Sequence, residues 1–316
     1  MPAPVPDTAE STSTASDLRR ARGGVLWAVL AYGSWGVFPI YWKQLRHIPA
    51  FEVLCHRVLW SCALVGIAMA IQGQLGAIRS ALADSKTRRV LLASTALIGV
   101  NWFLFIWAVT SGRILQASLG YYMNPLVNVA LGRLVLGERI SPAAAVAVAL
   151  AAAGVAIMAA GTGAVPWVAV SLAVTFALYG LCRKTVAVGP LVGLSVETIL
   201  IAPVAAIALA VLFARGQAAT QHATRIEWIF LAGSGFPTAI PLLAFAEAAR
   251  RLRFITVGIL QYIAPTLQFL CAVAIYHEAF TRNHAVAFGC IWGAVAIYAV
   301  DSIVRAKAPG KLLPRA

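Results

Sequence analysis

Five polar side chains stand in the middle of two long apolar runs, where they could bind a solute. They are Tyr121, Tyr122, Asn124, Gln261 and Tyr262. Each run also holds a proline, Pro125 or Pro265, and a proline inside a helix frees a backbone carbonyl about one turn earlier. Where such a break lines a water-filled cavity, the freed groups and nearby polar side chains can hold a solute. We therefore predict a substrate site here with the two prolines as hinges; the alternative is a helix–helix contact joined by polar side chains.

Two charges occur where lipid would be costly. Arg57 lies in the run FEVLCHRVLWS and Glu197 in GLSVETILIAP. A charge inside a membrane costs several kcal/mol unless it faces a cavity or a partner, which makes each one a candidate for function. The structural alternatives are a buried ion pair between the two residues, or an Arg57 side chain that reaches the headgroups.

Asn101 with Trp102, in the run 90–110, makes a second candidate cluster for the same cavity. Tyr32, Trp35 and Tyr179 are weaker candidates. Aromatic residues near the ends of membrane helices are more often interface anchors, so we assign no role to Trp42, Trp60 or Trp228.

Motifs for other chemistries are absent from the sequence. It has no phosphate-binding glycine-rich loop ending in Lys-Ser or Lys-Thr, no HExxH and no GxSxG. The five cysteines lie in or beside apolar runs without paired spacing, which favours buried thiols over a metal site or disulfides. We expect no cofactor, no metal and no enzymatic activity, since the loops are too short to house a catalytic domain.

Composition identifies the class of protein. The 316 residues are 61% hydrophobic and only 11% charged, whereas a soluble domain carries about a quarter charged residues. The chain is therefore predicted to be an integral membrane protein that contacts the lipid bilayer. The net charge of +14 comes from basic residues in short stretches between apolar runs, so it indicates topology rather than nucleic-acid binding.

The chain repeats itself at an offset of 140 residues. The matched pairs are Arg113 and Arg253, Tyr122 and Tyr262, Pro125 and Pro265, Glu138 and Glu278, Trp27 and Trp167, and Lys43 and Arg183. Chance does not supply six matches at one spacing, so the sequence indicates an internal duplication. At the same offset Arg57 matches Glu197, a cation against an anion.

The predicted fold is an all-α polytopic membrane protein with ten transmembrane helices. The apolar runs are 24–42, 50–72, 90–110, 114–136, 142–160, 165–182, 190–214, 227–248, 255–276 and 284–304. Five helices per repeat is an odd number, so the second copy enters the membrane from the opposite side, as in many transporters. The expected segments are a disordered tail (1–23), a first repeat (24–160), a linker (161–165), a second repeat (166–304) and a basic tail (305–316).

Basic residues predict the orientation. With both termini in the cytoplasm, seventeen Lys and Arg residues fall on the inner side, among them Arg183, against six on the outer side. The matched carboxylates Glu138 and Glu278 end their runs and are expected to serve at the turns rather than relay protons. The Ala- and Gly-rich run 142–160 and the pair Gly289 and Gly293 suit close helix packing, within the chain or in a homodimer.

Four motifs, in this order, resemble those of the RarD family, the EamA-type members of the drug/metabolite transporter superfamily. They are HRVLWS, NWFLFIWAV, SLGYYMNP and LGERIS, and the resemblance covers residues 24–304. It implies ten helices in two inverted repeats, and a bacterial inner-membrane carrier, in a family named for chloramphenicol sensitivity, that exports small metabolites or drugs. The second repeat departs from the first at residues 261–264, so we expect an asymmetric cavity.

The leading hypothesis is a secondary transporter that moves a small organic metabolite or drug by alternating access. An uncoupled facilitator or exchanger fits the same residues. A membrane-embedded enzyme would need a clustered acid, base or nucleophile, which the sequence lacks, and a non-transporting scaffold would use its charges for assembly alone.

Overall fold

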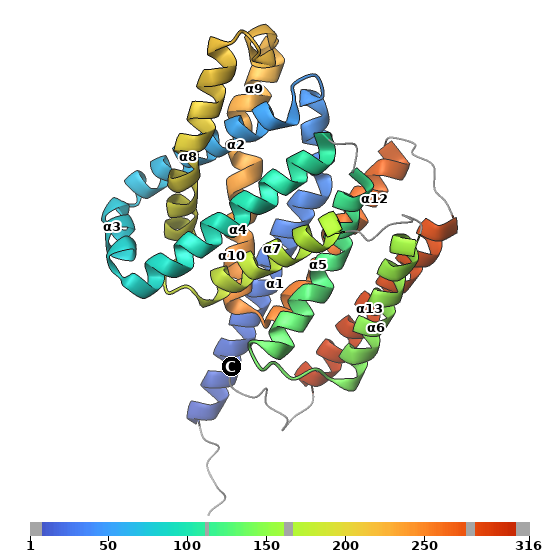
Figure 1. Cartoon of the computed structure of the whole chain (residues 1–316). Helices are drawn as coiled ribbons and strands as arrows, with labels where there is room; N and C mark the ends of the chain where they lie inside the picture. Colours follow the sequence, from blue (N-terminus) through green and yellow to red (C-terminus); the bar gives the residue numbers. More distant parts are fainter. Residues whose placement is uncertain (1–7, 111–113, 161–166, 276–281, 308–316) are drawn as a thin grey trace, which may run out of the picture.

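The computed structural model describes residues 8–110, 114–160, 167–275 and 282–307, and these residues are largely helical with no strand among them. The all-α prediction is confirmed for this part of the chain (Figure 1). The first half holds α1 (Thr8–Trp42), α2 (Ala50–Ile71), α3 (Leu75–Ala83), α4 (Ser85–Thr110), α5 (Ile114–Leu134) and α6 (Pro142–Ala160). The second holds α7 (Trp167–Thr185), α8 (Pro190–Ala214), α9 (Arg225–Gly233), α10 (Gly235–Arg251), α11 (Phe254–Leu260), α12 (Ile263–Leu270) and α13 (Arg282–Lys307). The short helical turns η1 (Lys43–Leu45), η2 (Ala219–His222) and η3 (Cys271–Ile275) complete the set.

Seven helical segments are long and apolar enough to cross a membrane, judged by length and composition in the described residues. They are Arg19–Leu45, Ala50–Ile71, Ser85–Phe105, Trp167–Thr185, Pro190–Ala214, Arg225–Arg251 and Ala285–Arg305. Two shorter apolar helices lie at Pro142–Ile157 and Phe254–Gln268. The chain is thus an integral membrane protein, and its count of ten crossings remains a prediction.

Several boundaries differ from those expected from the sequence. Helix α1 begins at Thr8, so most of the predicted disordered tail is helical, because adding a residue to an existing helix costs far less than starting one. The ninth apolar run is interrupted between α11 and α12. The predicted linker 161–165 and Glu278 lie outside the described residues.

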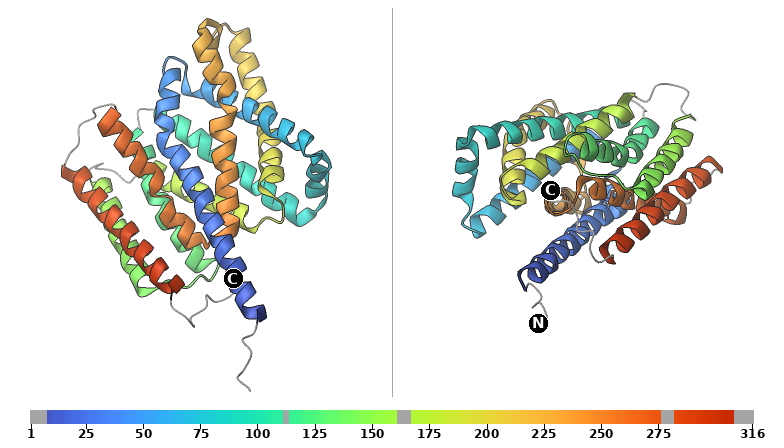
Figure 2. Two further views of the ribbon diagram at one scale, coloured as in Figure 1. Left: turned by 180° about the vertical axis from the view of Figure 1, so that it is seen from behind. Right: turned by 90° about the horizontal axis from the view of Figure 1, so that it is seen from below.

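Equivalent helices of the two halves pack reciprocally. Helix α1 contacts α10 and α12, while its counterpart α7 contacts α4 and α5. The pairs α2 with α8, α5 with α11, and α6 with α13 each join a helix to its own counterpart. Figures 1 and 2 show α6 and α13 side by side along one flank. The first turn of α1 and the last turn of α13 lie at the same end of the bundle (Figure 1), which we call the basic end.

Small residues bring two of these pairs together. A Cβ atom at Gly154 of α6 would lie 2.8 Å from the Ala287 carbonyl oxygen of α13, so this small-residue face packs within the chain. A Cβ atom at Gly258 of α11 would lie 2.8 Å from the Pro125 carbonyl oxygen of α5. Close backbone approach of this kind is how helices associate in lipid.

Two acidic side chains of the first half hold helix ends. Glu52 accepts hydrogen bonds from the backbone N–H groups of Ala219 (2.8 Å) and Thr220 (3.1 Å), which ties α2 to η2. Asp84 accepts a hydrogen bond from the Thr87 backbone N–H (2.8 Å) at the start of α4. The Thr87 hydroxyl and this backbone N–H lower the pKa of Asp84 below its ordinary value, because they stabilise the carboxylate. Both carboxylates are therefore engaged in structure.

Glu138 caps α11 of the other half. Its oxygens accept hydrogen bonds from the backbone N–H groups of Phe254 (2.6 Å) and Ile255 (3.0 Å). The prediction that this residue serves at a turn is confirmed, although the capped helix is α11 rather than the next one along the chain.

We expect Glu138→Ala to destabilise the fold by about 1–2 kcal/mol, because two N–H groups of a helix start lose their acceptor. Thermal unfolding of the purified protein, followed by tryptophan fluorescence, measures the loss. Glu138→Gln keeps one acceptor oxygen and should lose roughly half as much. Equal stability of both variants and the original protein would contradict the capping role.

Candidate functional site

Three candidate aromatic residues meet at the centre of the bundle. Tyr32 and Trp35 of α1 lie 5.8 Å apart between ring centroids, and Tyr179 of α7 stacks on Phe245 of α10 at 6.1 Å. Tyr32 and Tyr179 are almost fully buried, and the Tyr32 hydroxyl donates a hydrogen bond to the Val257 carbonyl of α11 (3.2 Å). The two tyrosines thus belong to the packed core that joins the halves.

Glu197 sits in a buried polar cluster built by three helices. Its carboxylate accepts hydrogen bonds from Ser94 of α4 (2.6 Å) and from Tyr179 of α7 (3.2 Å). The Arg183 guanidinium lies 3.5 Å from the same carboxylate, and the two side chains are 1% and 2% exposed. Arg183 also donates a hydrogen bond to the Pro190 carbonyl (3.0 Å) at the start of α8. Pro190 and Arg20 of α1 line one hollow, so the ion pair is near the basic end.

The pair corrects two expectations from the sequence. Arg183 lies in the last turn of α7 and is buried, so it is not one of the loop cations that report orientation. The buried ion pair forms between Glu197 and Arg183, so the alternative pairing of Glu197 with Arg57 is wrong. The short connection between α7 and α8 is the sequence signal for Arg183, because it places the end of one helix beside the start of the next.

Arg57 lies near the opposite end of the bundle, in the second turn of α2. Its Nε atom donates a hydrogen bond to the Thr238 hydroxyl of α10 (3.1 Å), and its guanidinium lies 4.5 Å from the centre of the Trp42 ring. Its charge lies in the neighbourhood of the Tyr41 and Tyr121 hydroxyl groups. No carboxylate pairs with Arg57 among the residues that the structure describes.

Tyr121 is the candidate from α5 that faces the Arg57 region. The side chain is 40% exposed, and its ring lies 6.0 Å from that of Phe105 in α4. Tyr122 points elsewhere, into an apolar cluster with Phe288 of α13 (5.6 Å). Its repeat counterpart Tyr262 belongs to the same cluster, so the structure separates Tyr121 from both.

An amide cluster joins α5 to the break between α11 and α12. Asn128 donates a hydrogen bond to the Gln261 side chain (2.7 Å). The Oδ1 atoms of Asn124 and Asn128 and the Tyr262 hydroxyl are buried without hydrogen-bond partners among the described residues. A buried polar atom without a partner is costly, so water or a solute group would be favoured there. Asn128 was missed from the sequence, although it lies one turn after Asn124.

The remaining candidates serve packing. Asn101 of α4 donates hydrogen bonds to the Leu172 carbonyl (2.9 Å) and the Thr175 hydroxyl (2.9 Å) of α7. Trp102 packs between the central core and the α2–α8 contact. Both therefore lie in the contacts between the halves.

The prolines have unequal effects on their helices. Pro125 lies inside the continuous helix α5, whereas α12, which contains Pro265, is separated from α11 by residues 261 and 262. Proline removes the N–H that would bond to the carbonyl four residues earlier, here that of Gln261. That carbonyl accepts a hydrogen bond from Ala264 instead (3.2 Å). The two runs thus differ in backbone at residues 261 and 262, while the asymmetric cavity stays a prediction.

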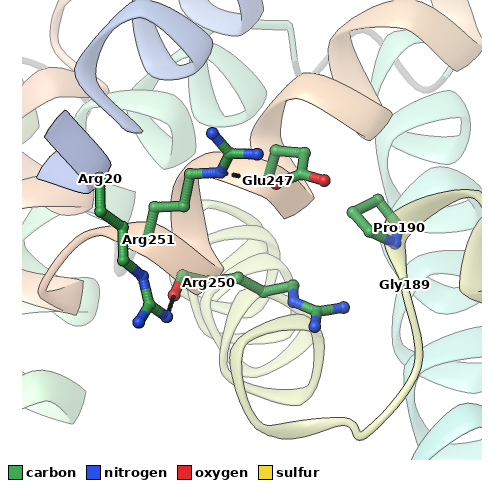
Figure 3. A pocket seen from close by; sticks show the side chains of 6 residues that line it. All are labelled: Arg20, Gly189, Pro190, Glu247, Arg250 and Arg251. Carbon is green, nitrogen blue, oxygen red and sulfur yellow. Dashed lines mark hydrogen bonds and ion pairs between the residues drawn. The ribbon is translucent and has the colours of Figure 1, made fainter. Parts of the chain in front are cut away.

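A hollow of about 380 Å³ opens at the basic end. Figure 3 shows its lining, in which Arg251 points to Glu247 and Arg250 extends toward the turn between α7 and α8. The lining residues are Arg20, Gly189, Pro190, Glu247, Arg250 and Arg251. Three guanidinium groups face one carboxylate, so this hollow has an excess of positive charge.

Comparison with known proteins identifies the family. Residues 22–160 match the EamA-like transporter family. The chain is 42% identical to Protein RarD of Escherichia coli over 290 residues, which cover 91% of this chain and 97% of that protein. It is also 42% identical to the Uncharacterized transporter YojE of Bacillus subtilis, over 89% of this chain and 94% of that protein. The chain belongs to the RarD family of EamA-type transporters.

Two further similarities extend this result. The RarD-family chain is 33% identical to the Chloramphenicol-sensitive protein RarD of Pseudomonas aeruginosa, over 90% of this chain and 96% of that protein. A solved crystal structure with 20% sequence identity superposes with a TM-score of 0.69 and covers 90% of this chain and 99% of that chain, which shows a shared fold. Membership of the RarD family gives this membrane protein the general role of a transporter of small molecules.

Proposed function

We propose that this RarD-family chain is a secondary carrier of a small organic solute in the bacterial inner membrane, with both termini in the cytoplasm. Ten membrane helices form two inverted halves, 24–160 and 166–304, which rock about the central contacts to expose the site to one side at a time. The solute binds beside Arg57 and Tyr121, and the Asn124–Gln261 region and the break before Pro265 move with it.

The reciprocal packing of equivalent helices is the observation that carries this proposal. Each contact of α1, with α10 and α12, has a counterpart in a contact of α7, with α4 and α5. The helices that lie on the axis pair with their own counterparts. A twofold relation between the halves produces this pattern. In carriers built from such repeats, the rocking of one half against the other around the site is the basis of alternating access.

The two ends of the bundle differ in a way that suits a carrier. Near the basic end the cluster of Glu197, Arg183 and Ser94 is closed and buried, whereas at the opposite end Arg57 and Tyr121 keep accessible surface. Under the proposal the structure is therefore closed on the cytoplasmic side. Opening that side by rocking the halves would require Ser94 of the first half to separate from Glu197 of the second, which it now contacts at 2.6 Å.

Counterflow tests the proposal directly. We expect proteoliposomes preloaded with a millimolar solute to accumulate the same radiolabelled solute transiently, for at least one member of a metabolite panel, and protein-free liposomes to show no accumulation. Accumulation driven by a pH gradient alone would indicate proton coupling; counterflow without that response would indicate a facilitator or exchanger. Neither response across the panel would favour the non-transporting scaffold.

A further inference from the structure

Arg57 carries a positive charge that no carboxylate among the described residues compensates. It lies within the apolar segment Ala50–Ile71. None of the ion pairs among the described residues involves its guanidinium. Its repeat counterpart Glu197 is already neutralised by Arg183. A charge within the membrane is costly unless it has a partner or faces a cavity, so the two equivalent positions are electrostatically unequal.

The guanidinium also keeps free hydrogen-bond donors. Thr238 uses only the Nε donor (3.1 Å). The two Nη atoms have no hydrogen-bond partner among the described residues. Neither is among the fully buried polar atoms that lack a partner. A guanidinium offers its donors in a planar fork that matches a carboxylate. The Nη atoms of Arg57 are therefore free of partners in the described part of the chain, and the side chain is partly exposed.

The groups around Arg57 define what else can bind there. The Arg57 guanidinium lies over the Trp42 ring, 4.5 Å from its centre, and this cation–π contact helps to hold it in place. Tyr121 is 40% exposed and packs against Phe105. An anion that engages the fork would thus place its remaining part against aromatic surface.

The hollow at the basic end also favours a negatively charged solute. Arg20, Arg250 and Arg251 line it, with Glu247 as the one carboxylate among its described lining residues. The carbonyl of Pro190, another lining residue, accepts a hydrogen bond from Arg183 (3.0 Å). A cleft lined by charge of one sign concentrates ions of the opposite sign. An anion would therefore be favoured at both ends of the proposed path.

We propose that the transported solute is a small organic monocarboxylate, bound by the Nη atoms of Arg57 with its apolar or aromatic part against Tyr121. This inference rests on the proposed carrier function. A single negative charge makes the complex with Arg57 neutral, which lowers the cost of holding the two charges inside the apolar segment while the halves rock. A phosphate monoester carries nearly two negative charges and would leave one uncompensated, while a cation would be repelled.

Three phenyl probes of similar size and different charge test the solute class. Phenylacetate, phenylacetamide and phenethylammonium are titrated separately against the purified full-length protein in detergent, and binding is followed by calorimetry. We expect phenylacetate to bind about tenfold or more tightly than phenylacetamide, because hydrogen bonds to a charged group are the stronger ones, and phenethylammonium to bind weakest. Equal binding of the three, or tightest binding of the amide or the cation, would overturn the proposal.

Variants assign the effect to Arg57. Arg57→Gln should remove the preference for phenylacetate, and Arg57→Lys should keep the charge preference with a several-fold weaker affinity, because the fork is lost. Arg215→Gln removes an exposed cation at the end of α8 and should change neither. If Arg57→Gln does not yield folded protein, the probe series on the unaltered protein and on Arg57→Lys still decides. A phenylacetate preference that persists in a folded Arg57→Gln variant would overturn the assignment.

Counterflow separates this proposal from the carrier function. Counterflow of neutral or cationic solutes alone, unaffected by Arg57→Gln, would overturn the solute class and leave the carrier standing. Selective phenylacetate binding at Arg57 without counterflow of any carboxylate in the panel would overturn the carrier and leave an anion-binding site.

Discussion

Glu197→Gln is expected to destabilise the protein by about 3–5 kcal/mol, the largest loss that we predict for a single substitution, because removing one partner of a buried ion pair costs about this much. The change leaves the Arg183 charge buried at 1% exposure without its counterion. Glutamine has nearly the shape of glutamate, so the substitution alters the charge rather than the packing. Thermal and denaturant unfolding of the detergent-purified protein, followed by tryptophan fluorescence, measures the change.

The matched control is Glu247→Gln, which removes the carboxylate of the partly exposed pair with Arg251 (2.8 Å). Exposed pairs contribute about 0–1 kcal/mol, so its loss should be small. The double variant Arg183→Met with Glu197→Leu removes both charges and should recover much of the stability. Similar losses for Glu197→Gln and Glu247→Gln would show that the buried pair is not a structural element.

Gly258→Leu should destabilise the protein by about 3 kcal/mol, at the upper end of the range for overpacking. A Cβ atom at this position would lie 2.8 Å from the Pro125 carbonyl oxygen and 2.9 Å from the Asn128 Cβ atom. The first contact is backbone in α5, which cannot turn aside as a side chain would, so α5 and α11 must separate. The same unfolding measurement and the yield of monodisperse protein report the effect.

Gly289→Leu provides the control, since among the described residues no atom beyond its chain neighbours and its own helix backbone lies within 4 Å of a Cβ built there. It adds the same side chain to α13 and should leave stability nearly unchanged. Comparable losses at both positions would mean that leucine is tolerated poorly for reasons other than the α5–α11 contact.

Periodicity and composition were sufficient for the helices because lipid leaves backbone groups no partner outside the segment. Each predicted apolar run is mostly helical in the described residues, and the 140-residue repeat places equivalent helices in register. The start of α1 at Thr8 and the break before α12 were not predicted, because both depend on how a helix continues or ends within its packing.

The sequence predicted which residue types belong to the candidate site, but not which of them lie next to each other in the structure. Tyr121 and Tyr122 are adjacent in sequence, yet they turn to different surfaces of α5, one toward Arg57 and the other toward Phe288. Their separation follows from the roughly 100° turn between successive helix residues once the neighbours of α5 are known. Nothing in the sequence around Tyr122 predicts that α13 is the helix against which it packs.

The sequence by itself determined that this is a helical membrane protein related to the RarD family, with matching residues at a fixed offset, since hydrophobicity and internal similarity are properties of the chain alone. Tertiary structure alone decided which charges meet. Arg183 and Glu197 pair because α7 and α8 bring them within 3.5 Å, while Arg57 has no carboxylate partner in the described part of the chain. Electrostatic energy depends on distances in space, and those are set by helix packing rather than by position in the sequence.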